Sequence, residues 1–405
     1  MTEIFTGEFT QQEPIPEVAI EAAVALMRSG RLHRYNIAKG EQGHVALLEQ
    51  EFAASVEASF CLAVASGGYA LAMALRALDV QPGDKVLTNA FTLAPVPGSI
   101  ASVGAIPVYV GVTEDLVIDL EDLQAKIAQS NVLMLSHMRG HICDMDQLMK
   151  ICEHAGVRVI EDCAHTMGAK WRETWSGRHG VVGCYSTQTY KHINSGEGGF
   201  LVTDDADVMA KAVILSGSYM LYDRHIAAPA ASYFDDIRYH TPNVSGRMDH
   251  LRAAILRPQL ANLQAQAQAW NVRYQAVEAA LAHTPGLKLI SRPDEESYVG
   301  SSIQFLLLDW AADRIENLLA RCASRGVELK WFGGREPTGY TSRYDSWLYA
   351  PSSAMPKSDR ILAGVIDMRL PLTFSLEDCA VIGRIIRAEV GALYQLADGA
   401  SQSAI

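Results

Sequence analysis

The stretch GCYSTQTYKHINSGEGGFLVTDD, residues 183–205, sets one lysine, Lys191, between a polar run and a glycine-rich turn that enters an apolar strand. Glycines let backbone segments approach closely. A lysine that reacts with a carbonyl must be partly neutral near pH 7, which burial and neighbouring positive charge bring about. We therefore interpret Lys191 as a Schiff-base lysine; a solvated loop lysine is the alternative. Ser186 and Gln188 supply a hydroxyl and an amide close to it.

The strand after this lysine is one of a series in which apolar strands alternate with helical patterns. Strands are expected at 85–91, 105–112, 132–138, 157–164 and 198–203, and helices at 70–80 and 119–127, the latter capped by Asp119. This alternation is typical of a mostly parallel sheet with helices packed outside it. The sequence therefore predicts an α/β fold with a three-layer α/β/α large domain.

A long helical stretch, residues 248–284, follows the last of these strands and is expected to break at Pro258. Beyond it, SIQFLLLDW, ADRIENLLARCASRGVELKWF and LEDCAVIGRIIRAEVGALYQL indicate a smaller α+β domain. We predict a large domain over residues 1–262, including an N-terminal segment, and a small C-terminal domain over residues 263–405.

Composition limits the partners of the 405-residue chain. A formal net charge of −12 disfavours nucleic acid and anionic membranes, although a phosphorylated ligand needs only local donors. The longest apolar runs, such as 303–308, are strand-sized, and the N-terminus lacks a basic and apolar leader. Seven scattered cysteines suit a reducing compartment. We expect a cytoplasmic enzyme with no nucleic-acid or membrane partner.

Two further stretches carry candidate binding groups. In ASGGYALAMAL (65–75), Gly67 and Gly68 enter a helix whose free N–H groups and dipole favour a phosphate; a simple tight turn is the alternative. In VRVIEDCAHTMGA (157–169), Asp162 ends a strand at the edge where α/β proteins bind ligands. Its carboxylate could cap a helix, or keep a heteroaromatic nitrogen protonated. A phosphate cradle, a carboxylate and an amine match three groups of pyridoxal 5′-phosphate (PLP): its phosphate, its pyridine nitrogen and its aldehyde.

The order of SGGYAL, FTLAPVPGSIASVGAIPVYV, EDCAHTMGA, YSTQTYKHINSGEGGFLVT and RMDHLRAAI resembles the DegT/DnrJ/StrS family of sugar aminotransferases, and SRGVELKWF and DMRLPLTFSLEDCAVI are similar to its closing segments. The likeness covers nearly the whole chain. It implies the aspartate-aminotransferase-like fold type I and a homodimer with shared active sites. It also implies ping-pong transfer of an amino group from a small-molecule donor, glutamate or glutamine, to a keto-sugar, a cyclitol ketone or a related carbonyl metabolite.

The resemblance also implies residue roles. Lys191 would form the Schiff base and carry the proton, Asp162 would hold the pyridine nitrogen, and His165 would lie near the ring. Gly67, Gly68 and Ser186 would bind phosphate, with Gln188 as a further candidate. No metal is expected.

Four features depart from the family pattern. Gly68 replaces the usual threonine and is followed by a bulky Tyr69, which is expected to help rebuild the cofactor site. Leu93 replaces a stacking aromatic, and Ser245 replaces the asparagine that reaches the partner subunit's phosphate. WFGGREPTGY (331–340) replaces a histidine-containing substrate segment. Candidate substrate residues are Tyr35, Arg247, Trp331 and Arg335, each with packing or surface placement as the alternative.

Three other functions are compatible with parts of this pattern. The changes at Gly68, Leu93 and Ser245 allow a PLP enzyme that cyclises, oxidises or decarboxylates an amino acid. Related sugar dehydratases carry histidine where this chain has Lys191, which disfavours dehydration. A non-catalytic sensor is disfavoured because the chain is acidic and carries no appended DNA-binding segment.

Overall fold

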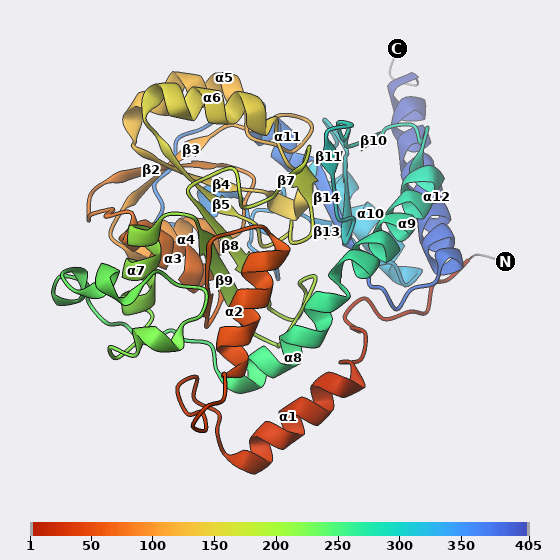
Figure 1. The fold of residues 1–405 in the computed structure, drawn as a ribbon. Helices are drawn as coiled ribbons and strands as arrows, with labels where there is room; N and C mark the ends of the chain where they lie inside the picture. The colour runs from red at the N-terminus through yellow and green to blue at the C-terminus, as the bar shows by residue number, and fades with distance from the viewer. Residues whose placement is uncertain (1–2, 403–405) are drawn as a thin grey trace.

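The computed structural model describes residues 3–402, with side-chain burial described through residue 396, and shows a three-layer α/β unit beside a smaller α+β unit (Figure 1). The central sheet has seven strands in the order β1-β9-β8-β5-β4-β2-β3. Their bounds are β1 Phe60–Val64, β2 Lys85–Asn89, β3 Ile106–Val110, β4 Val132–Ser136, β5 Arg158–Asp162, β8 Val182–Ser186 and β9 Gly199–Thr203. Only β9 runs against the others. The predicted mostly parallel sheet is confirmed.

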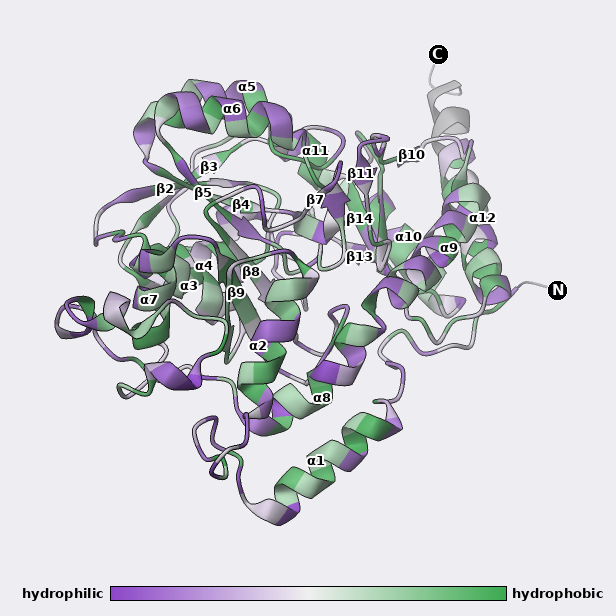
Figure 2. Cartoon of the chain, in the orientation of Figure 1, coloured by the Kyte–Doolittle hydropathy of each residue, from purple (hydrophilic) through white to green (hydrophobic). Residues whose placement is uncertain are grey.

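Side chains that alternate along each strand supply the cores of the two outer layers. Leu201 faces one layer, whereas Phe200 and Val202 face the other. The first layer holds α3 (Gly67–Ala77), α4 (Pro95–Ser102) and α7 (Ala206–Leu215). The second holds α2 (His44–Ser55), α5 (Leu120–Lys126), α6 (Met145–Ala155) and α8 (His250–Ala261). Figure 2 shows the resulting apolar strands between helices with polar outer surfaces. Both faces of the sheet are therefore buried, as parallel sheets require.

The smaller unit is built on an antiparallel sheet with the order β10-β12-β14-β13. Its strands are β10 Lys288–Leu289, β12 Ser302–Leu306, β13 Lys330–Trp331 and β14 Val365–Arg369, and its helices are α9 Leu263–Leu281, α10 Ala312–Ser324 and α12 Leu376–Gln402. Besides short 3-10 helices, the other elements are α1 Glu17–Ser29, α11 Pro356–Ala363, and a small sheet of β6 Lys170–Trp171, β7 Thr174–Trp175 and β11 Glu296–Ser297.

The N-terminal segment crosses from one unit to the other. Phe5 and Phe9 pack edge-to-face on Phe374 within the core of the small unit, and the backbone N–H of Phe5 donates to the carbonyl of Arg325 (2.9 Å). The division at residue 262 stays a prediction, but these first residues pack with the C-terminal part rather than with the part to which we assigned them.

The predicted break at Pro258 is wrong. Helix α8 runs through Pro258 to Ala261, and Asn262 (φ −101°, ψ 0°) separates it from α9. Pro258 lies in the last turn, where its missing N–H costs a single backbone hydrogen bond. Burial of Leu256 and Gln259 on either side holds that turn in place.

No helix within residues 3–402 combines the length and the apolar character needed to cross a membrane.

Candidate active site

The parallel strands of the central sheet all have their carboxyl ends at one edge of the sheet. A cavity of about 270 Å³ lies at this edge. β1 ends before Ser66, β2 before Leu93, β5 at Asp162 and β8 at Ser186. Eight predicted cofactor residues line this cavity: Gly67, Gly68, Leu93, Asp162, His165, Ser186, Gln188 and Lys191. This is the position at which open α/β sheets bind ligands.

Lys191 lies on the loop after β8, with its backbone N–H donating to the carbonyl of Gln188 (2.9 Å). Its Nζ is 2.9 Å from Nε2 of His165. Burial and the positive charge of Arg139 lower the pKa of Lys191 to about 7, although Asp162 opposes the shift. A large fraction of the amine is therefore neutral, and nucleophilic, near neutral pH.

His165 is held as a neutral imidazole beside this amine. Burial, followed by the charge of Lys191, lowers the pKa of His165 well below its usual value. A neutral ring can accept a hydrogen bond from the protonated lysine or, as the other tautomer, donate one to the free amine. The pair can therefore hold a proton at Nζ or accommodate its loss.

Asp162 ends β5 and is oriented by two hydrogen bonds. Its Oδ2 accepts from the hydroxyl of Ser136 (3.0 Å), and its Oδ1 accepts from the backbone N–H of Ala164 (3.2 Å). Burial raises the pKa of Asp162. Because burial disfavours the charged form of Asp162, a nearby cation would stabilise the carboxylate, and a protonated ring nitrogen would supply that cation.

The N-terminus of α3 forms another wall of the cavity. The side chain of Ser66 caps the helix by accepting from the N–H of Tyr69 (3.1 Å). A Cβ added to Gly67 would lie 2.9 Å from Cβ of Ser186, whereas one added to Gly68 would meet only Pro95, at 3.7 Å. The close approach of Gly67 to β8 brings the free N–H groups of the helix to the cavity, where they favour an anion.

Two predicted cofactor residues lie outside this cavity. The hydroxyl of Tyr69 donates to the carbonyls of Val244 (2.6 Å) and Leu215 (3.2 Å), so the phenol ties α3 to a neighbouring segment. Ser245 accepts from the guanidinium of Arg247 (3.2 Å).

The four candidate substrate residues also lie outside the cavity in their own chain. Tyr35 shares a hydrogen bond with His225 (2.8 Å), and burial raises the pKa of Tyr35 to about 12. Arg247 donates to the carbonyl of Gly217 (2.9 Å), Trp331 donates to the carbonyl of Ala363 (2.7 Å), and Arg335 is exposed. Their substrate roles stay predictions.

Sequence reasoning missed several residues around Lys191. Ser66, Met138 and Tyr340 line the same cavity, and Arg139 lies close enough to lower the pKa of Lys191. Met138 and Arg139 come two and three residues after the end of β4, so the rule that places ligands at strand ends could have found them. Tyr340 belongs to the unusual 331–340 segment, but only the fold shows which of its residues reaches the cavity.

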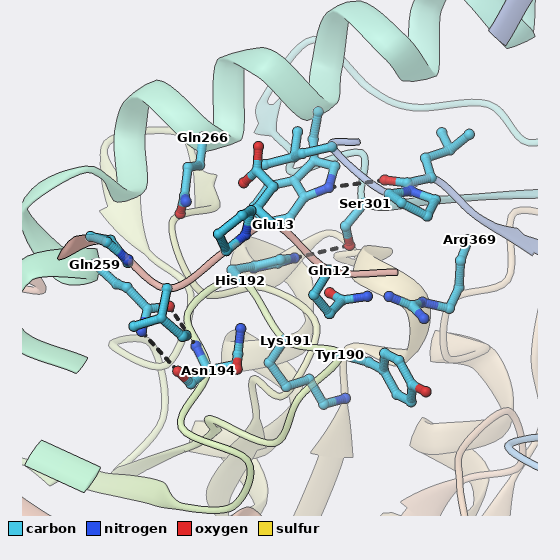
Figure 3. A pocket seen from close by; sticks show the side chains of 17 residues that line it. Gln12, Glu13, Tyr190, Lys191, His192, Asn194, Gln259, Gln266, Ser301 and Arg369 are labelled. Atoms are coloured by element: carbon cyan, nitrogen blue, oxygen red, sulfur yellow. Dashed lines mark hydrogen bonds between the residues drawn. The ribbon is translucent and has the colours of Figure 1, made fainter. Parts of the chain in front are cut away.

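A second cavity of about 60 Å³ adjoins Lys191 (Figure 3). The N-terminal segment covers it through Gln12 and Glu13, and Tyr190 and Arg369 line it from the lysine loop and the end of β14. Lys191 therefore stands between the main cavity and a smaller polar space on the side of the small unit.

Within the described residues, one group of side chains has the composition of a metal site: His137, Glu161 and Cys163. Glu161 already accepts hydrogen bonds from His137 (3.0 Å) and from the backbone N–H groups of Gly177, His179 and Gly180 (2.7–2.9 Å). Burial raises the pKa of the Cys163 thiol well above its usual value, which favours the protonated thiol over the thiolate that a metal would need. These contacts explain Glu161 as the centre of a structural hydrogen-bond network that fixes β5 to the loop at 176–180.

The architecture places the chain in a known class of enzyme folds. The crystal structure of 3-amino-5-hydroxybenzoic acid synthase superposes with a TM-score of 0.81 at 24% identity, covering 97% of this chain and 100% of that one. The fold is therefore the predicted aspartate-aminotransferase-like fold type I.

The chain belongs to the DegT/DnrJ/EryC1/StrS aminotransferase family, whose sequence model matches residues 17–387. It is 32% identical to a Micromonospora echinospora protein provisionally named L-glutamine:3-amino-2,3-dideoxy-scyllo-inosose aminotransferase, over 69% of this chain. The match spans 66% of that protein, just under two thirds of its length. It is 29% identical to the dTDP-3-amino-3,4,6-trideoxy-alpha-D-glucose transaminase of Streptomyces venezuelae, over 77% of each chain.

Proposed function

We propose that this protein is a PLP-dependent aminotransferase that transfers an amino group from glutamate or glutamine to a small ketone of the sugar or cyclitol class. The observation that carries the proposal is the Lys191 amine, with its pKa lowered to about 7 and its Nζ 2.9 Å from His165, in one cavity with the carboxylate of Asp162. The names of the two relatives above, one acting on a cyclitol and one on a nucleotide sugar, support the acceptor class.

The residues of the cavity fit PLP. The N-terminus of α3 at Gly67 and Gly68, together with Ser186 and Gln188, offers donors to a phosphate. Leu93 and Met138 supply apolar walls for a ring, and Asp162 offers a negative charge to its nitrogen. Leu93 can pack against a ring without aromatic stacking, so its departure from the family pattern is compatible with this role. When bound, PLP supplies an aldehyde that condenses with amines and a ring that accepts an electron pair.

With PLP bound, each side chain around it would have a separate role. Lys191 would hold the aldehyde between turnovers and, once displaced by the amino donor, would take a proton from one carbon and return it to another. Its lowered pKa suits both tasks near neutral pH, and a positioned proton carrier contributes roughly 10²–10⁴-fold to such steps. Asp162 would keep the ring nitrogen protonated, and His165 would orient the lysine amine.

We further propose a cytoplasmic homodimer whose two sites each take residues from both subunits. Ser245 and Arg247 line no part of the cavity in their own chain, which is expected if they act in the partner's. Exposed apolar residues on α1 and on the 219–244 segment, among them Met27, Tyr219 and Met220, support an interface there. All seven cysteines are free and buried, which supports a reducing compartment.

The lysine assignment is tested with the purified protein and added PLP. We expect an absorbance band that borohydride bleaches, with the cofactor fixed to Lys191 as seen by mass spectrometry of peptides. Lys191→Ala should lose the bleachable band, whereas Lys170→Ala, which removes a lysine packed over Trp175, should keep it. A bleachable band in Lys191→Ala would refute the assignment. Conversion of the band by glutamine would distinguish transamination from cyclisation, oxidation or decarboxylation.

A further inference from the structure

Arg139 connects the large α/β unit to the small α+β unit. It lies three residues after the end of β4, and its guanidinium pairs with Asp367 of β14 (2.9 Å). The same guanidinium donates to the backbone carbonyl of Tyr340 (3.3 Å) and lies 5.6 Å from the centre of the Phe332 ring. One side chain of the large unit therefore contacts both a strand of the small unit and the 331–340 segment.

The surroundings of Arg139 hold this side chain in place. Arg139 and Asp367 are both buried, and the second carboxylate oxygen of Asp367 accepts from the side-chain amide of Gln304 (2.7 Å). The side-chain oxygen of Gln304 is in turn 2.8 Å from Nε2 of His141, two residues beyond Arg139. Arg139 has a φ of +56°, in the left-handed region that residues other than glycine rarely adopt. The turn that carries Arg139 is thus joined to the small sheet at two points.

The charge of Arg139 also acts on the reacting groups of the active site. Burial is the largest cause of the lowered pKa of Lys191, and Arg139 is the next. Arg139 contributes to the lowered pKa of His165 as well, after burial and Lys191. Asp162 opposes the shift of the Lys191 pKa, and Arg369 adds a smaller effect in the same direction as Arg139. The other titratable groups that line the cavities beside Lys191 are Glu13, Tyr190, His192, Glu197 and Tyr340.

We infer that Arg139 is a positioning residue that acts between the two units. Its contacts with Asp367 and with the Tyr340 carbonyl hold the 331–340 segment over the cavity, and its fixed charge favours the neutral form of the Lys191 amine. Two like charges repel each other more strongly inside a protein than in water, so a buried guanidinium disfavours a second cation nearby. Asp367 anchors this charge and cancels part of it. The inference rests on the proposed function only for the reaction that Lys191 performs.

The reactivity of the Lys191 amine is measured first, without turnover. The full-length protein, freed of any bound cofactor, is reacted with pyridoxal between pH 6 and pH 10, reduced with borohydride, and mapped by mass spectrometry of peptides. Only the neutral amine attacks the aldehyde, so the rate of labelling at Lys191 rises with pH. We expect the midpoint of this rise near pH 7 in the wild type. Arg139→Gln, which removes the charge but keeps an N–H donor, should raise the midpoint by about one pH unit.

Two further variants separate the effect of charge from a loss of structure. Asp367→Asn should move the midpoint downward, because the charge of Arg139 is then uncompensated. The matched control is Arg158→Gln. Arg158 begins β5, at the opposite end of the strand from Asp162, and donates to the carbonyl of Leu78 (2.8 Å). This change removes the same charge away from the cavity and should leave the midpoint unchanged.

Hydrogen exchange, measured by mass spectrometry, reports on how firmly the 331–340 segment is held. We expect its backbone N–H groups to exchange about tenfold faster in Arg139→Gln and in Asp367→Asn, since each change removes a buried polar contact. Arg158→Gln should match the wild type. The first two variants therefore change the exchange rate in the same direction, whereas they move the labelling midpoint in opposite directions. A purely structural role for Arg139 would not produce that difference.

The inference is overturned if Arg139→Gln matches the wild type in the labelling midpoint or in the exchange of the 331–340 segment. It is also overturned if the midpoint does not move downward in Asp367→Asn, because a general loosening of the site would admit water and raise the pKa of Lys191. Should Arg139→Gln not fold, the direction of the shift in Asp367→Asn decides the outcome. Failure of the proposed function is seen separately: the protein with PLP would show no absorbance change with any amino donor, while the labelling of Lys191 would still report on Arg139.

Discussion

At the scale of single residues, the sequence was most informative where chemistry depends on local pattern. Lys191, Asp162 and His165 were predicted as one site, and the structure places all three in one cavity. Arg369 and Tyr340 were not singled out, because their importance depends on how the small unit lies against the lysine loop. Whether an arginine at the end of a strand meets a carboxylate depends on tertiary contacts, and among residues 3–402 Arg369 is paired with none.

The lowered pKa of Lys191 predicts a pH-dependent stability in the protein without cofactor. Burial and Arg139 lower this pKa to about 7, so between pH 7 and the ordinary lysine value the unfolded chain binds more protons than the native one. The free energy of unfolding should therefore rise with pH in this window, by roughly 1 kcal/mol per pH unit from this group. Lys191→Met should lack this rise. Urea unfolding at pH 7.5, 8.5 and 9.5 measures the free energy of unfolding of the wild type and of Lys191→Met. If this free energy changes with pH in the same way in both proteins, the lowered pKa of Lys191 is contradicted.

At the scale of elements, the ends of strands and the starts of helices were predictable from sequence. How closely neighbouring elements pack against one another was not. The Gly67-Gly68 pair was predicted to open a helix, and Asp119 was predicted to cap one; both are confirmed, the latter by its hydrogen bonds to Glu121 and Asp122. The prediction of a break at Pro258 was wrong because a helix anchored by buried residues such as Leu256 and Gln259 tolerates the loss of one hydrogen bond near its end.

The two glycines of α3 should respond differently to an added methyl group. Gly67→Ala would place a Cβ 2.9 Å from Cβ of Ser186, so strand and helix must move apart, and we expect a loss of about 1–3 kcal/mol in the free energy of unfolding. Gly68→Ala meets only Pro95, at 3.7 Å, and should change stability by less than about 1 kcal/mol. Chemical denaturation of the two variants, without cofactor, provides the comparison. Equal losses would show that the approach of α3 to β8 is looser than described.

At the scale of the whole molecule, the order of motifs predicted the three-layer fold and the small α+β unit, since both depend on periodicity along the chain. The path of the first residues was not predictable. Phe5 and Phe9 meet Phe374 across more than 360 residues of sequence, and nothing near them in the sequence indicates that contact.

Subunit mixing tests whether the sites are shared. Lys191→Ala and Arg247→Ala should each be inactive alone, because the first lacks the reacting amine and the second lacks a group proposed to reach the partner's cavity. In a mixed dimer, one of the two sites would combine an intact Lys191 with an intact Arg247 from the other subunit. Random exchange of subunits should then restore about a quarter of wild-type turnover. Differently tagged subunits must first be shown to co-purify; if mixed dimers form and turnover stays at the level of the separate variants, each site is complete within its own chain.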